Sequence, residues 1–208
     1  RWLYNIPKNQ LTGSLRPLGR LAFNFHHERI YRKISDELAK AALPENLAIT
    51  SETTQLIPSE LPPQVIFVGS VAGGLGSGLF LDLAFTTRVC MTEQGFSSDH
   101  LFGLFAHSTS RYVGDHRLSI ANSVSFLNEL YHFNLNGYPG NAPCDIPAFD
   151  DETPVFDGTY LVHLGDDIST EEFDRGVDGM AEYLYAGTAT RCRAFFDVCR
   201  NTQEFEAG

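Results

Sequence analysis

The sequence predicts an α/β fold in which helices cover both faces of a parallel sheet. Three short apolar runs, at 65–71, 101–106 and 159–164, have the length and composition of strands buried on both faces. Stretches with helical periodicity separate these runs, and such alternation is typical of a parallel sheet. The glycine-rich segment 73–78 follows the first run directly, which indicates a tight turn from that strand into a helix.

The first helix is predicted after the turn-forming residues 12–17. Its apolar residues recur every three to four positions, as on one face of a helix: Leu21, Phe25, Ile30, Ile34 and Leu38. The next segment, 44–63, is polar and contains spaced prolines. We therefore expect it to be a connector between this helix and the first strand.

The later helices alternate with the strands. One continues from the glycine-rich segment through 79–85, and another runs from about 119 to 130, between the second and third strands. The last begins near Thr170 and extends to about 181–185. This order completes the predicted sheet with a helix after each strand.

Charge and composition exclude several classes of function. The 208 residues include 15 basic and 26 acidic side chains, a net charge of -11, which argues against binding to nucleic acid or to an anionic membrane. No apolar run approaches the ~20 residues of a membrane-spanning helix. The four cysteines form no C-x-x-C pair, so we expect free thiols in a reducing compartment and a cytoplasmic protein.

The segment Gly73-Gly74-Leu75-Gly76-Ser77-Gly78 has the chemistry of a phosphate cradle. Its position between a strand and a helix brings backbone amides to a helix N-terminus, where hydrogen bonds and the helix dipole both favour an anion. Glycine lets the backbone approach the phosphate closely, and Ser77 can add a hydroxyl donor. The alternative is a tight turn that binds no ligand.

The residue order of this segment differs from that of other nucleotide-binding and hydrolase motifs. A Walker loop requires Gly-Lys followed by Ser or Thr, and no lysine is present. A dinucleotide fingerprint requires G-x-G-x-x-G, whereas the glycines here alternate as Gly74, Gly76 and Gly78. Leu75 precedes Ser77 by two residues, so the G-x-S-x-G of a nucleophile elbow is also absent.

The segment resembles the G-G-G-T-G-[ST]-G phosphate loop of tubulin and of its bacterial cell-division relative FtsZ. Ala72 and Leu75 replace two residues of that loop, and five positions match: Gly73, Gly74, Gly76, Ser77 and Gly78. These substitutions suggest a divergent bacterial tubulin-like protein. The resemblance implies that residues 1–208 form part of a Rossmann-like GTP-binding domain, because the family's first nucleotide loop and its activation domain have no counterpart in this sequence.

The same resemblance implies a ligand and further phosphate and ribose contacts. The ligand would be GTP or GDP, with or without Mg²⁺, and no side chain is assigned as a metal ligand. The turn before the first helix would approach the terminal phosphates through Gly13 and Arg16. Arg117 would contact ribose or phosphate from the start of the helix after the second strand, and Asn122 would face the site from the same helix. For Arg16 a solvated position, and for Asn122 an ordinary polar helix position, remain alternatives.

Two acidic residues are the candidate readers of the guanine base. We expect the third strand to end at Leu164, which brings Asp166 to the carboxyl edge of the sheet. A carboxylate there can accept hydrogen bonds from guanine N1–H and from its exocyclic amine. Residues 170–208 would comprise the start of the family's central helix and the loop after it, with Glu171 as a second base contact. An acid at a helix start is also favoured by the helix dipole alone.

The resemblance also bears on hydrolysis and self-association. In the family, a loop with the pattern N-x-D-x-x-D is pressed by one subunit onto the nucleotide of the next, head to tail. Asp197 fits the final, catalytic acid of this loop, but Cys192 and Ala194 replace the other two residues. We therefore expect GTP binding with weak hydrolysis at most.

Three functions remain open from the sequence. The chain can be a nucleotide-dependent protein that assembles into oligomers or filaments, or a regulatory nucleotide-binding module that neither polymerises nor hydrolyses. A third possibility is an α/β enzyme that uses His107, His116 or His163 as a base. No nucleophile or metal-ligand spacing supports this third function, and histidines in strands or helices are commonly structural.

Overall fold

The structure is a computed structural model, and it describes residues 11–56, 63–110, 116–192 and 195–196. Three strands form one sheet in the order β1-β2-β3: β1 (Val65–Ser70), β2 (Leu101–Ser110) and β3 (Gly158–Ile168). Both strand pairs are parallel, with Val65 opposite Leu101 at the start of the first pair. The predicted parallel sheet is confirmed.

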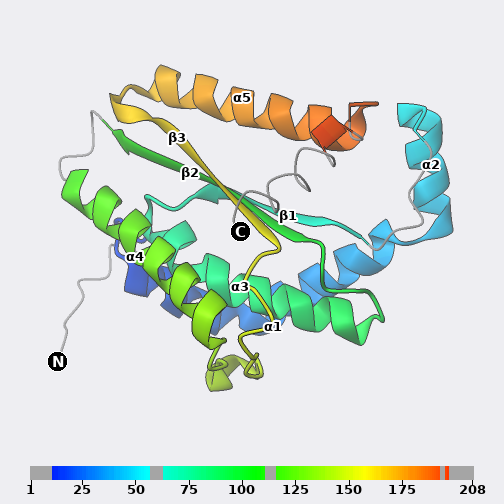
Figure 1. The fold of residues 1–208 in the computed structure, drawn as a ribbon, viewed down its shortest axis with the longest axis horizontal. Helices are drawn as coiled ribbons and strands as arrows, with labels where there is room; N and C mark the ends of the chain where they lie inside the picture. The colour runs from blue at the N-terminus through cyan, green and yellow to red at the C-terminus, as the bar shows by residue number, and fades with distance from the viewer. Residues whose placement is uncertain (1–10, 57–62, 111–115, 193–194, 197–208) are drawn as a thin grey trace.

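Helices cover both faces of this sheet (Figure 1). The helices are α1 (Arg16–Ala41), α2 (Pro44–Thr54), α3 (Gly74–Glu93), α4 (His116–Asn136), the short 3-10 helix η1 (Ala142–Cys144) and α5 (Thr170–Ala189). Helix α5 lies along one face, and α1, α3 and α4 lie on the other (Figure 1). Within the described ranges, no helix combines the length and the apolar character that crossing a bilayer requires.

Two apolar clusters hold the helices on the sheet. The larger cluster joins β2 to α1, α3 and α4, and it includes the fully buried rings of Phe23, Phe85, Phe105 and Phe126. The smaller cluster packs Leu104 and Ala106 of β2 against Met180 of α5. Successive residues of β2 therefore face opposite layers, which explains why its sequence is apolar on both sides.

The segment 44–63, expected as a connector, contains helix α2. Pro44 occupies the first turn of α2, where its missing N–H costs nothing, and Glu45 beside it favours the positive end of the helix dipole. None of the residues of α2 is buried. Local preferences therefore explain this helix, which has no apolar face that a periodicity argument could detect.

Strand β3 was expected to end at Leu164, but it continues to Ile168. Its pairing with β2 is shifted twice. His107 lies opposite His163 while Ser108 lies opposite Gly165, and Ser110 then lies opposite Ile168. Gly165 adopts a φ of 125°, which is open to glycine and strained for other residues. Asp166 thus lies inside a bulged strand rather than in a loop beyond it.

Candidate functional site

The glycine-rich loop connects the end of β1 to the start of α3. Gly73 precedes the helix in an extended conformation, and no side chain of the described residues caps the helix N-terminus. The first amide with an intrahelical acceptor is that of Ser77, which donates to the Gly73 carbonyl over 3.3 Å. The amides of residues 74–76 therefore have no intrahelical acceptor, an arrangement suited to an anion. The carboxyl end of β1 leads into the N-terminus of α3 (Figure 1).

The four glycines of this loop differ in what an added Cβ would contact. A Cβ on Gly74 would lie 2.6 Å from the Leu15 nitrogen, and one on Gly76 would lie 2.1 Å from the Ser70 oxygen. A Cβ on Gly78 would lie 2.4 Å from the carbonyl oxygen of Arg16. A Cβ on Gly73 would meet no atom of the described chain within 4 Å. Three of the glycines thus permit close backbone packing, and Gly73 is the one that borders open space.

The side chains of Ser77 and Leu75 do not present a donor to a ligand in this structure. The Ser77 hydroxyl, predicted as a phosphate donor, donates to the Gly73 carbonyl at 2.6 Å, and Ser77 is buried. The Leu75 side chain is half exposed and offers no donor of its own. In this conformation the loop therefore presents backbone amides, rather than a hydroxyl, to a ligand.

The turn before α1 lies directly beside this loop. Gly13 and Ser14 both have positive φ, 55° and 62°, and the Leu15 amide closes the turn by donating to the Thr12 carbonyl at 2.9 Å. The close approach of Gly74 to Leu15 shows that the two segments touch. The structure thus brings Gly13 next to the glycine-rich loop, and its contact with the terminal phosphates stays a prediction.

The Arg16 side chain links α1 to α3 and α4. Its Nε donates to the Ser77 carbonyl at 2.6 Å, and its two terminal nitrogens pair with both carboxylate oxygens of Glu129 on α4. This bidentate pair is among the stronger kinds of protein hydrogen bond. All three nitrogens of the guanidinium are engaged within the chain, so a phosphate contact by Arg16 stays a prediction that would require these bonds to change.

Asn122 connects the two loops of the site. Its side-chain amide donates to the Ser14 carbonyl at 2.9 Å and to the Ala72 carbonyl at 3.0 Å, and the residue is buried. Both donor hydrogens are therefore used to fix the turn before α1 against the glycine-rich loop. This positioning role is a function that sequence reasoning did not assign to Asn122.

We expect Asn122→Leu to lower the free energy of unfolding by about 1–3 kcal/mol, because two carbonyls would lose their buried donor. Urea unfolding followed by circular dichroism measures this change. Asn128→Leu is the matched control, since Asn128 is exposed on the same helix and should change stability little. Equal effects of the two substitutions would contradict the assignment.

Besides Asn122, three residues are predicted to contact ribose or base, and they lie near the same edge of the sheet. Arg117 is exposed in the first turn of α4, and Glu171 is exposed in the first turn of α5. The N-terminal cap of α5 is a reciprocal pair between Ser169 and Glu172, so Glu171 does not form it. Asp166 is also exposed, and one of its oxygens accepts a hydrogen bond from the Thr109 hydroxyl at 3.3 Å.

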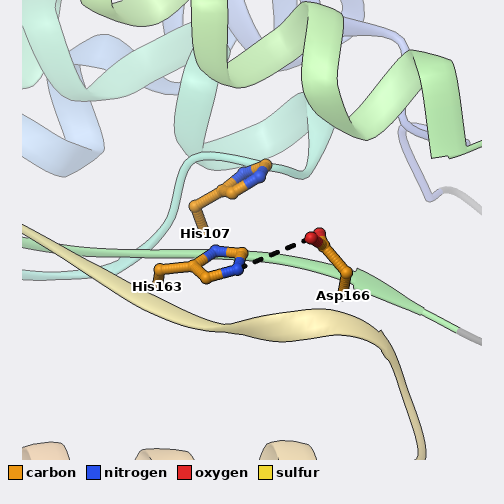
Figure 2. A group of neighbouring side chains, drawn as sticks. All are labelled: His107, His163 and Asp166. Carbon is orange, nitrogen blue, oxygen red and sulfur yellow. Dashed lines mark ion pairs between the residues drawn. The ribbon is translucent and has the colours of Figure 1, made fainter.

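Sequence reasoning missed a cluster formed by His107, His163 and Asp166 (Figure 2). The imidazole rings of the two histidines stack with centroids 5.5 Å apart, and His163 Nε2 lies 3.7 Å from an Asp166 oxygen. Burial, and then the proximity of His163, lower the pKa of His107 against the opposing effect of Asp166, so its ring is neutral at physiological pH. Gly165 is the sequence signal for the strand bulge that allows this cluster.

The predicted catalytic loop is only partly visible. Asp197 and Ala194 lie outside the described residues. Cys192 is a free, exposed thiol, as Cys90 and Cys144 are free and buried thiols. The catalytic assignment of Asp197 therefore stays a prediction.

The structure is a Rossmann-like α/β domain. Its parallel sheet has helices on both faces, and its first strand leads through a glycine-rich turn into a helix. The profile of a family described as tubulin like matches residues 1–202, so the chain belongs to the tubulin-like family. No curated protein and no solved structure matches the chain. The family resemblance inferred from the glycine-rich loop is thus confirmed at the level of the tubulin-like family.

Proposed function

We propose that this tubulin-like chain binds a guanine nucleotide, GTP or GDP, with its phosphates at the N-terminus of α3. The observation that carries the proposal is the row of amides at residues 74–76. Among the described residues no side chain caps these amides, and Gly73 leaves them open to a ligand. Hydrogen bonds from these amides, together with the helix dipole, stabilise phosphate even in a chain of net charge -11.

The surrounding residues support this site by holding its backbone in place. Asn122 fixes the turn at Gly13 and Ser14 against the loop, and Arg16 holds the first turn of α3 against α4. A pre-formed cradle avoids the entropy cost of ordering these segments when a ligand binds. Mg²⁺ would enter with the phosphates, and no side chain is assigned to it.

The base is proposed to lie at the carboxyl edge of β3, near Asp166, with Arg117 and Glu171 at the adjacent helix starts. Asp166 is exposed there, and the Thr109 hydroxyl engages only one of its two oxygens at hydrogen-bond distance. A carboxylate can accept from two guanine donors, whereas adenine in the same pose leaves it partly unpaired. This difference favours GTP over ATP.

We expect Asp166→Asn to reduce the preference for GTP over ATP by about 1–3 kcal/mol, the usual contribution of a bidentate base contact. The measurement is competition of ATP against labelled GTP in buffer free of transition metals. Asp167→Asn is the matched control, because it makes the same charge change one residue further along β3. An unchanged ratio in Asp166→Asn, with binding retained, would transfer base reading to Glu171 or to another residue.

Hydrolysis and assembly form the finer part of the proposal. Cys192 and Ala194 cannot supply the polar residue and the acid that activate water in the family pattern, so we propose slow hydrolysis at most, with Asp197 as its remaining acid. Any assembly would be head to tail, with the nucleotide at the boundary between subunits. A cytoplasmic bacterial protein fits this proposal. Phosphate release by the unmodified protein, measured over hours at several protein concentrations, tests both points, since boundary-driven turnover rises with concentration.

A further inference from the structure

The cluster of His107, His163 and Asp166 lies outside the residues assigned to phosphate. Each of the three offers one ligand atom, and these atoms all lie within 4.8 Å of one another (Figure 2). Two imidazoles and one carboxylate form a donor set that suits Zn²⁺ and neighbouring divalent transition metals better than Mg²⁺ or Ca²⁺.

The strand bulge brings the third ligand to the face of the other two. His107 and His163 are register neighbours on parallel strands, so their side chains share one face of the sheet. In a regular strand Asp166, three residues after His163, would face the opposite side. The register shift leaves Leu164 as the extra residue, and the positive φ of Gly165 accompanies it, so that Asp166 returns to the histidine face.

Two of the three ligands have outer hydrogen-bond partners. The Ser123 hydroxyl of α4 lies 2.7 Å from His107 Nδ1, which fixes the ring and leaves Nε2 for a metal. The Thr109 hydroxyl donates to one Asp166 oxygen at 3.3 Å, and the other oxygen lies toward His163. Metal-binding histidines and carboxylates are commonly oriented by such second contacts.

An ion pair alone does not account for this arrangement. The side chains of His163 and Asp166 are 54% and 73% exposed, and pairs this exposed contribute little to stability. Tetrahedral zinc with ligands at about 2.0–2.1 Å requires donor atoms about 3.3–3.4 Å apart. The 3.7 Å between His163 Nε2 and Asp166 Oδ2 is already close to that separation. All three ligand atoms lie within 4.8 Å of one another, so the remaining separations must shorten by up to about 1.5 Å when a metal binds.

We propose that His107, His163 and Asp166 bind a divalent transition metal of the Zn²⁺ class, with a fourth position open to water or another ligand. The site lies beside the glycine-rich loop, because Ala106, the residue before His107, accepts a hydrogen bond from the Val71 amide at 3.0 Å. Its ligands differ from the phosphate-binding amides. The proposal therefore does not rest on nucleotide binding, and it is tested without nucleotide.

The test is titration of the tag-free chain with Co²⁺, followed by absorption spectroscopy, and with Zn²⁺, followed by calorimetry. All samples carry Cys192→Ser, so that the exposed thiol does not bind the probe. We expect one equivalent to bind, and His163→Ala and Asp166→Asn each to weaken binding at least about a hundredfold, beyond the range for outer partners. Ser123→Ala should weaken binding by about 10–100-fold, as the loss of an outer partner does.

His132→Ala is the matched control, since His132 is exposed on α4 away from the cluster and should leave binding unchanged. Circular dichroism checks that each variant is folded. Because the side chains of His163 and Asp166 are exposed, we expect these two variants to keep the fold. Absence of stoichiometric binding would overturn the proposal. Equal affinity in His163→Ala and the parent, or a loss in His132→Ala as large as in His163→Ala, would overturn it as well.

Discussion

Replacement of Gly76 with Val is expected to lower the free energy of unfolding by at least about 3 kcal/mol, the upper end of the usual cost of overpacking. The new Cβ would lie 2.1 Å from the Ser70 carbonyl oxygen and 2.7 Å from the Phe80 ring. Ser70 belongs to β1, which is paired along its length with β2, so its backbone cannot retreat without breaking the sheet. Urea unfolding at equilibrium measures the loss.

Gly179→Ala is the control for glycine replacement as such. Gly179 lies in α5, and a Cβ there would meet no atom of the described chain within 4 Å. Alanine at this position should stabilise the protein by about 0.8–1 kcal/mol through its higher helix propensity. A Gly76→Val variant with the same unfolding midpoint as the parent would show that the described packing between β1 and α3 is wrong.

Replacement of Gly73 with Val should remove nucleotide binding and leave the fold intact. Gly73 has φ -87° and ψ 158°, which a branched residue adopts readily, and an added Cβ would meet no atom of the described chain within 4 Å. A phosphate on the neighbouring amides would be displaced by the added methyl groups. Loss of two charge-assisted hydrogen bonds, at about 1.5–3 kcal/mol each, corresponds to at least about a hundredfold weaker GTP binding.

Leu75→Ala is the matched control for the nucleotide experiment. Leu75 is the half-exposed residue of the same turn, and its truncation keeps every amide while removing side-chain bulk. GTP affinity should stay within a few-fold of the parent. Gly74 and Gly76 cannot serve in this experiment, because their substitution would disturb packing and binding together. Undiminished affinity in folded Gly73→Val would exclude the loop as the phosphate cradle.

The sheet and its covering helices could be predicted from the sequence because their signals are local. The run at Val65 is apolar on both faces and too short for a helix, and β2 has the same character. Helix α2 was not predicted, since its few apolar residues form no periodic face and none of them is buried. The extension of β3 to Ile168 was also missed, because a bulge depends on pairing with β2 and not on the composition of β3 alone.

Some features of the candidate site could also be predicted from the local sequence, whereas others depend on distant contacts. The helix N-terminus at Gly74 follows from the order of strand, glycines and helix, which is visible in the sequence. The partners of Arg16 and Asn122 could not be predicted from the sequence. Arg16 pairs with Glu129, and Asn122 donates to Ser14, each more than a hundred residues away along the chain. The histidine cluster was invisible for a related reason, since a single inserted residue in β3 decides which face Asp166 occupies.

Equilibrium binding of labelled GTP to the unmodified protein, with the folded Gly73→Val variant measured beside it, tests the central claim most directly. We expect saturable binding of one nucleotide per chain, displaced by GDP, displaced more weakly by ATP, and lost in Gly73→Val. If unlabelled ATP and GTP displace labelled GTP equally well, the phosphate cradle would be supported and guanine recognition would be contradicted. No saturable binding to the unmodified protein, or equal affinity in the parent and Gly73→Val, would contradict the proposal that the N-terminus of α3 binds a nucleotide.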